Sequence, residues 1–174
     1  DGTFADVTAS VGLDLQLQED GGGSGGMVAA DFNNDGLPDL YVGVAGRRNR
    51  LFLANGNGGF NDVPLADIED AESYGVAVGD IDNDGDMDIL QTASGDLRTG
   101  LPGLAERSTL LLNLGDGQFI DVTNSAGLGR IANQQAQAPS LGDFDNDGDL
   151  DLLISNPPLL FANDGHGVFT NVTE

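Results

Sequence analysis

The chain has 174 residues and a formal net charge of −23, from 29 acidic and 6 basic side chains. It contains no cysteine, which excludes disulfide bonds, thiolate catalysis, zinc ribbons and iron–sulfur clusters. So acidic a chain repels nucleic acid and anionic membranes, and no apolar run reaches the roughly 20 residues of a membrane-spanning helix. Nucleic acid is therefore not an expected partner, and no direct membrane span is predicted.

In chain order, the hydrophobic residues form short runs that repeat one pattern three times. Each unit opens with an apolar run of small residues, followed by an acidic loop, two more hydrophobic runs and a Gly-rich turn before an aromatic strand. Such runs, separated by Gly, Asn and Asp, are typical of strands, and no segment keeps a helical period. The expected strands are 27–30, 40–44, 50–53 and one from Phe60; 74–78, 89–92, 109–112 and one from Phe119; and 139–141, 152–154, 159–161 and one from Phe169.

The repeat predicts an all-β fold built of β-propeller blades. A closing strand over residues 1–8 precedes three four-stranded units at 27–63, 74–122 and 138–173, and the interruption 94–108 is expected to be a surface insertion. Three blades and a spare strand do not close a ring, because propellers have about four to eight blades. We expect a segment of a larger propeller, and the alternative is assembly of several copies through open sheet edges.

The aspartates are concentrated in the acidic loops. Of the 24 Asp residues, 13 lie in the windows 31–39, 80–88 and 143–151. Carboxylates this close repel each other by roughly 1 kcal/mol or more per pair, and a divalent cation would remove that cost. Position 6 of each loop is Gly, which permits a sharp reversal of the chain. The clustering indicates local chemistry rather than a general device for solubility.

The spacing of the oxygen donors fits Ca²⁺. Side chains at positions 1, 3, 5 and 9 and the backbone carbonyl at position 7 offer oxygen only, and Ca²⁺ takes about six to eight such ligands. Mg²⁺ is the second choice, and zinc, copper and iron are disfavoured. An EF-hand is excluded because position 12 lies in an expected strand. Three sites are predicted, formed by Asp31, Asn33, Asp35, Leu37 and Asp39; by Asp80, Asp82, Asp84, Asp86 and Asp88; and by Asp143, Asp145, Asp147, Asp149 and Asp151.

Three sequence motifs carry a family resemblance: Gly79-Asp80-x-Asp82-x-Asp84-Gly85-x-x-Asp88-Ile89, Leu110-Leu111-Leu112-Asn113, and Phe4-Ala5-Asp6-Val7-Thr8 with its repeat Phe119-Ile120-Asp121-Val122-Thr123. They resemble FG-GAP or VCBS-type repeats, as in integrin α-subunit propellers and the cartilage acidic protein and ASPIC/UnbV relatives. The departures are Asn33, which lowers the ligand charge of the first loop, Pro38, and the stretch 61–64. The resemblance implies Ca²⁺ in the blade loops, away from a ligand surface, and a role in extracellular adhesion or ligand binding.

We therefore expect a calcium-stabilised module for recognition, adhesion or assembly, without catalysis. Millimolar extracellular calcium would keep such loops filled, so the expected location is extracellular, at the cell surface or periplasmic. The expected partner is a protein or glycan ligand, or further copies of the same or another chain at the open sheet edges. Two alternatives stay open: a polysaccharide lyase or hydrolase domain on a calcium-loop propeller, and a structural subunit of a larger complex.

Other motifs carry weaker signals. Residues 22–26 satisfy G-x-S-x-G, but no helix follows, so the stretch is interpreted as a Gly-rich connector before a strand. His166, the single His, occupies a hairpin position and is interpreted as a turn residue. The basic cluster Arg47-Arg48-x-Arg50 is interpreted as local neutralisation of an acidic surface, with a contact to an anionic group as the alternative.

Overall fold

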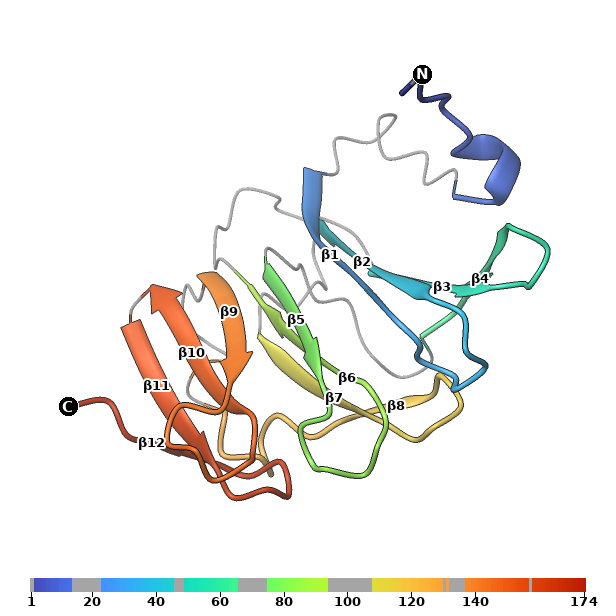
Figure 1. Ribbon diagram of the computed structural model, residues 1–174. Coiled ribbons are helices and arrows are strands. Elements are labelled where there is room, and N and C mark those ends of the chain that lie inside the picture. Colours follow the sequence, from blue (N-terminus) through green and yellow to red (C-terminus); the bar gives the residue numbers. More distant parts are fainter. Residues whose placement is uncertain are drawn as a thin grey trace.

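A computed structural model of the chain describes residues 2–13, 23–45, 49–65, 75–93, 108–129, 131, 137–156 and 158–174. Within these ranges the chain is all-β, with three four-stranded antiparallel sheets and one short 3-10 helix, η1, at Ala9–Val11. Figure 1 shows the three sheets standing side by side. The predicted all-β fold of four-stranded units is confirmed. None of the described residues belongs to a helix long and apolar enough to cross a membrane.

Each sheet is a meander whose strands pair in sequence order, and we call the sheets blade one (β1–β4), blade two (β5–β8) and blade three (β9–β12). The described strands do not close into a ring. Position 12 of each acidic loop lies in the second strand, as expected. The bounds are β1 Gly23–Ala30, β2 Asp39–Ala45, β3 Arg50–Ala54, β4 Phe60–Val63, β5 Gly75–Gly79, β6 Asp88–Thr92, β7 Thr109–Asn113, β8 Phe119–Asp121, β9 Gln137–Gly142, β10 Asp151–Asn156, β11 Pro158–Asn163 and β12 Phe169–Asn171.

Gly-rich turns join the third and fourth strands of each blade. In blade two, Gly115 and Gly117 have φ angles of 89° and 76°, and the matching glycines of the other blades also have positive φ. A residue with a Cβ atom is disfavoured in this left-handed region by about 1–2 kcal/mol. These angles confirm the predicted hairpins.

Two apolar cores lie between the blades. Alternate residues of a strand face opposite sides of the sheet, so each blade presents one apolar set forward to the next blade and another backward. In the first core, the rings of Phe32 and Phe119 pack edge to face with their centroids 5.8 Å apart. The core between blades one and two contains Phe32, Tyr41, Leu51, Ile89, Leu111 and Phe119. The core between blades two and three contains Ile81, Leu90, Leu110, Leu152, Ile154, Phe161 and Phe169.

The first strands of neighbouring blades, β1 with β5 and β5 with β9, also contact one another. Glycines permit this close approach: a Cβ on Gly26 would lie 2.8 Å from the backbone nitrogen of Val76, and one on Gly75 would lie 2.5 Å from Pro139 Cδ. The stretch 22–26, expected to be a connector, is therefore largely part of β1, which starts at Gly23. That prediction was wrong because a glycine in a strand often marks the close approach of another backbone.

The closing strand expected over residues 1–8 is not formed in residues 2–8, the part that the structure describes. Phe4 is 99% exposed, whereas its counterpart Phe119 in β8 is 8% exposed. A strand needs a neighbour for its backbone hydrogen bonds, and β8 has one in β7. Residues 2–8 have no strand of the described chain beside them, so the expectation is corrected here.

Two expectations fall wholly or partly outside the described residues. Residues 94–107, most of the interruption expected to be a surface insertion, are among those not described, as is residue 74. Ser108, at the end of the interruption, is buried and its hydroxyl accepts a hydrogen bond from the Ala93 N–H at 3.2 Å. The surface insertion therefore stays a prediction.

Gly75→Ala is expected to destabilise the fold, because the added methyl group would overlap Pro139 Cδ and Thr92 Oγ1. Overpacking of this kind costs about 1–3 kcal/mol. Gly142→Ala in β9 is the matched control, since nothing lies within 4 Å of a Cβ at that position. Urea denaturation of the two variants measures the difference, and equal stability would contradict the close packing of β5 on β9.

Candidate metal centres

The three acidic loops each join the first strand of a blade to its second strand, and they share one backbone shape. Position 4 is an Asn with positive φ in every loop: 58° at Asn34, 61° at Asn83 and 64° at Asn146. Asn tolerates this left-handed conformation better than most residues. Position 6 is a Gly with positive φ, and nothing lies within 4 Å of a Cβ built on Gly36 or Gly85. Conformation, rather than lack of space, requires Gly at position 6.

The carboxylates at positions 1 and 5 hold the loop in this shape. In loop two, Asp80 Oδ1 accepts the N–H of Asp84 at 3.0 Å and Oδ2 accepts the N–H of Gly85 at 3.1 Å. Asp84 Oδ1 in turn accepts the N–H of Asp86 at 2.9 Å. Loops one and three repeat all three bonds. These carboxylates therefore replace the backbone partners that a tight turn lacks.

The carboxylate at position 9 is buried and joins the loop to the third strand. Asp88 Oδ2 accepts the N–H of Ile81 at 2.7 Å, and Oδ1 accepts the N–H of Asn113 in β7 at 2.9 Å. Asp39 and Asp151 make the same pair of bonds in blades one and three, and all three side chains are at most 1% exposed. Position 9 thus has a structural role in addition to the ligand role that its spacing predicts.

Loops two and three bring the carboxylates of positions 1, 3 and 9 together. Oxygens of all three groups lie within 4.8 Å of one another in each loop. The position-5 carboxylates are not part of these groups, and one oxygen of each accepts the N–H of position 7. The position-7 carboxylates accept bonds from the preceding blade's loop instead, as described below. The clusters are Asp80, Asp82 and Asp88, and Asp143, Asp145 and Asp151.

Loop one differs because its position 3 is an amide. Asn33 Nδ2 donates to Asp35 Oδ2 at 3.1 Å, and Asn33 Oδ1 accepts the N–H of Asp35 at 3.2 Å. Because the amide carries no charge and donates to Asp35, loop one has less repulsion between like charges than the other two loops. Asp31 and Asp39 remain beside it as acidic groups, with Leu37 at position 7.

Burial controls the electrostatics of the carboxylates in loop two. Burial raises the pKa of Asp88 to about 7. Burial also raises the pKa of Asp82, with a smaller contribution from the charge of Asp84, and Asp82 Oδ1 is buried without a hydrogen-bond partner. A buried charged oxygen without a donor is costly unless a cation compensates it. Burial raises the pKa of Asp39, and desolvation, followed by the charge of Asp147, raises that of Asp145.

The donor set fits a hard cation. All side-chain donors of the two clusters are carboxylate oxygens, which suit Ca²⁺, and no thiolate or imidazole belongs to either cluster. His166 lies in its own hairpin, where its backbone N–H donates to Asp164 Oδ1 at 3.0 Å and its ring Nδ1 lies 3.1 Å from the Asp164 carbonyl oxygen. Arg50 forms an ion pair with Asp62 and stacks on Phe52, which agrees with local neutralisation. Residues 46–48, with the other two arginines, lie outside the described residues.

Sequence reasoning missed the Asn at position 4, although all three loops carry it. Asn34 Nδ2 donates to Asp86 Oδ1 at 2.6 Å, and Asn83 Nδ2 donates to Asp149 Oδ1 at 2.8 Å. Each bond crosses from one blade to the next. The recurrence of Asn was the available signal, but spacing within one unit does not reveal a contact with another unit.

Three antiparallel blades, each with a D-x-[DN]-x-D-G-x-x-D loop between its first two strands, define a repeat protein of the β-propeller type. The chain belongs to the FG-GAP-like repeat family, which it matches over residues 31–90 and 101–154, more than half of its length. This family assignment agrees with the resemblance of its loop, third-strand and closing motifs.

Two curated relatives show the extent of the similarity. The chain is 30% identical over 168 residues to cartilage acidic protein 1 of Xenopus tropicalis and 28% identical over 166 residues to that of Homo sapiens. Each alignment covers 90% of this chain but only 24% and 23%, respectively, of the relative. The chain therefore spans about a quarter of the length of these curated relatives.

In the presence of a chelator, stability is expected to fall as the pH rises from about 4 to about 7. Folded Asp88, with its pKa raised from 3.8 to about 7, holds a proton more tightly than the unfolded chain does. Its contribution to stability is therefore complete below pH 4 and is lost as the pH rises through 7. Urea midpoints measured between pH 5 and pH 8 test this.

Saturating Ca²⁺ supplies the control for the pH series. Because a cation competes with the proton for the same oxygens, calcium should remove or reverse the decline in stability. Urea midpoints that stay constant with pH in the chelator would contradict the raised pKa.

Proposed function

We propose that this chain is a calcium-stabilised recognition or assembly module that works outside the cytoplasm and has no catalytic role. The observation that carries the proposal is the convergence of three carboxylates within 4.8 Å in loop two and again in loop three. In loop two, burial raises the pKa of Asp88 to about 7 and also raises the pKa of Asp82, so a cation beside these carboxylates would stabilise their ionised forms. The partnerless Oδ1 of Asp82 supports a cation at this point.

Calcium would act here as a structural ion. Positions 1, 3 and 9 would hold it, with the position-5 carboxylate and the position-7 carbonyl as the further donors that the spacing predicts. The ion would keep position 9 ionised, and ionised Asp88 is the stronger acceptor for the N–H groups of Ile81 and Asn113. Ion binding and the attachment of the third strand would therefore support each other.

The location follows from the calcium supply. Loops of this kind in extracellular modules bind calcium in the range of about 10⁻⁴–10⁻³ M, which extracellular calcium satisfies and resting cytosol does not. The similarity to cartilage acidic protein 1, whose name refers to cartilage, supports an extracellular setting. We therefore place the chain in an extracellular, cell-surface or periplasmic setting.

The charge favours particular partners. Three divalent ions would offset only part of the formal net charge of −23. A protein or glycan ligand that is cationic, or that binds through a shared calcium ion, is therefore favoured over an anionic one. Assembly with further sheets at the open edges is compatible with this role.

The enzyme alternative, a polysaccharide lyase or hydrolase, needs a base beside the metal and a group that polarises the substrate. Among the described residues, Arg50 is paired with Asp62, and the ring Nδ1 of His166 lies 3.1 Å from the carbonyl oxygen of Asp164 in its own hairpin. This arrangement supports a binding module. Sustained turnover of an acidic glycan to unsaturated products would favour the enzyme.

Calcium is expected to raise the melting temperature of the wild-type protein. Asp82→Ala should reduce this response, because it removes one carboxylate ligand of the loop-two site. Each site would contribute about 1.4–2.7 kcal/mol when free calcium exceeds the Kd by about 10- to 100-fold. In a chelator, the variant should be at least as stable as wild type, because a buried carboxylate with a raised pKa has been removed.

Asp116→Asn is the matched control, since Asp116 is an exposed hairpin residue whose carboxylate bonds only to Gln118 in the described structure. It should keep the full calcium response. Thermal unfolding with and without chelator measures both variants. A wild-type melting temperature that calcium does not change would contradict the proposal.

Asn33→Asp is expected to tighten calcium binding at loop one, because it restores the carboxylate that the other loops carry at position 3. In a chelator the same change should destabilise the fold, since the donor to Asp35 is lost and a negative charge is added. Isothermal titration measures the affinity, with Asn57→Asp in the adjacent hairpin as the matched control. Unchanged affinity in Asn33→Asp would show that loop one does not bind calcium through position 3.

A further inference from the structure

Polar contacts of one kind recur at both interfaces between blades. At the first interface, Asn34 Nδ2 donates to Asp86 Oδ1 at 2.6 Å and to the carbonyl of Gly115 at 3.3 Å. At the second, Asn83 Nδ2 makes the same two bonds, at 2.8 Å to Asp149 Oδ1 and 3.2 Å to the carbonyl of Gly165. In each case position 4 of one loop contacts position 7 of the next loop and a hairpin glycine. The hydrogen bonds to a carboxylate are charge-assisted only at the acceptor, which still makes them stronger than neutral ones.

A second contact lies deeper, at the end of the third strand. Asn113 Nδ2 in β7 donates to the carbonyl of Phe32 in blade one at 2.9 Å, and Asn163 Nδ2 in β11 donates to the carbonyl of Ile81 in blade two at 2.8 Å. Both Asn side chains are buried. Leaving a buried carbonyl without a hydrogen-bond donor costs about 1–3 kcal/mol. A following blade with Asn at this position is therefore favoured over one without it. We call the position-4 and third-strand contacts together the inter-blade latch.

Each blade contributes to the latch, on its forward side, the position-4 amide and the carbonyl of position 2. In blade three no described blade lies against these groups. Phe144 is 46% exposed, whereas Phe32 and Ile81, at the same position of the other loops, are fully buried. Leu153 is 49% exposed, whereas its counterparts Tyr41 and Leu90 are at most 1% exposed. The forward face of blade three, which we define as Phe144, Asn146, Leu153 and Leu160, therefore repeats the chemistry of two established interfaces.

On its backward side, a following blade contributes to the latch the position-7 carboxylate, a hairpin carbonyl and the Asn at the end of its third strand. Blade one lacks two of these three groups. Its position 7 is Leu37, which lies beside Gly56 as Asp86 lies beside Gly115, but which has no carboxylate. Its third strand ends in Ala54, where blades two and three have Asn113 and Asn163. Of the three groups that a following blade offers, blade one keeps only the carbonyl of Gly56.

The backward face of blade one is otherwise built like that of blade three. Val42, Val44 and Phe52 form a buried cluster there. Gly12 approaches the carbonyl of Phe60, with 2.6 Å from an added Cβ, as Gly127 approaches that of Phe169. The apolar residues therefore correspond to those of blade three, with Leu13 of this chain already packed on the cluster, and the latch groups are what differ.

We propose that the latch determines which blade can follow which, and that the forward face of blade three accepts one class of partner. That partner is a further FG-GAP-type sheet with Asn at the end of its third strand and Asp at position 7 of its acidic loop. Blade one of a second copy is not such a partner. The proposal rests on continuity with the two interfaces in the structure, and it does not depend on calcium binding.

The test gives blade one the missing groups. Leu37→Asp combined with Ala54→Asn is expected to make the protein associate head to tail, about tenfold or more tightly than wild type. Sedimentation velocity over a concentration series measures the association. Adding Asn146→Gly, which keeps the positive φ of position 4, should remove the part of the gain that the new carboxylate supplies, because it deletes the amide that donates to it. Leu37→Ser with Ala54→Ser is the matched control and should associate no more than wild type.

Two results would overturn the proposal. One is wild-type association as tight as that of the double variant and abolished by Leu153→Asp, which would show that the face accepts blade one without the latch. The other is a double variant that keeps the circular dichroism and melting temperature of wild type but associates no more tightly.

A second measurement covers the case in which the double variant does not fold. Asn34→Gly preserves the positive φ of position 4 and removes its amide, and Asp86→Leu gives loop two the residue of loop one. If the two residues act as one latch, the combined shift in the urea midpoint is smaller than the sum of the single shifts. Fully additive shifts would overturn the proposal.

Discussion

The buried aspartate at position 9 of each acidic loop is the contact on which the rest of the blade depends. Asp88 accepts one N–H from its own loop and one from the third strand, and Asp39 and Asp151 do the same. An ionised carboxylate in this place is costly unless hydrogen bonds and a cation compensate it. The crowding of acid in the loop would thus have a structural reason, because the proposed ion would neutralise it beside the contact that joins the loop to the third strand.

The fold is built at two levels that use different chemistry. Within a blade, hairpins and the acidic loop connect neighbouring strands. Between blades, apolar faces and the inter-blade latch determine which sheets match, and glycines such as Gly75 allow the first strands to approach closely. Because positions 2, 4 and 7 of the same loops make the interface contacts, the proposed ion binding within a blade and the packing between blades share a short stretch of chain.

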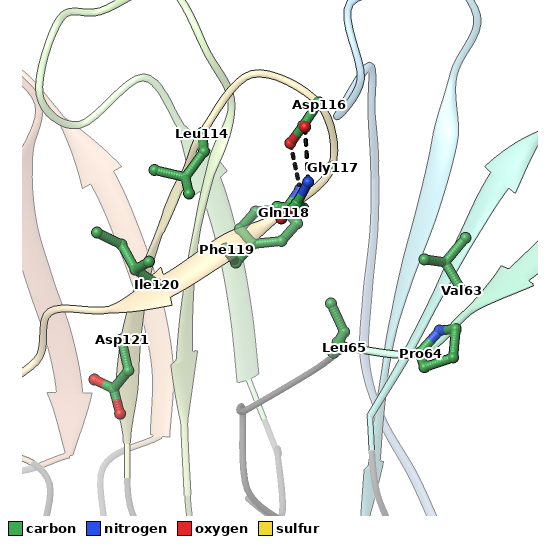
Figure 2. A pocket seen from close by; sticks show the side chains of 10 residues that line it. All are labelled: Val63, Pro64, Leu65, Leu114, Asp116, Gly117, Gln118, Phe119, Ile120 and Asp121. Atoms are coloured by element: carbon green, nitrogen blue, oxygen red, sulfur yellow. Dashed lines mark hydrogen bonds between the residues drawn. The ribbon is translucent and has the colours of Figure 1, made fainter.

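Figure 2 shows a groove at the interface between blades one and two. It lies between β4 and β8 and is lined by residues that include Val63, Leu65, Leu114 and Ile120. At the next interface, the Phe169 N–H donates to the carbonyl of Ala126 at 2.9 Å, so the connector itself packs against the outer strand.

Most of the strand order was predictable from sequence, because short apolar runs between Gly and Asp turns have few alternatives. The loop spacing also located the candidate metal ligands, but it did not reveal that position 5 accepts a backbone N–H or that Asp86 and Asp149 bond to the preceding blade. Those contacts depend on how units pack. The strand expected near Phe4 was wrong for the same reason, since a strand requires a neighbour that a sequence pattern does not supply.

The most direct test is hydrogen exchange at the backbone amides of Asn113 and Asn163, the donors to position 9. Our account predicts that calcium slows exchange at both amides, and exchange rates that do not change with calcium would contradict it.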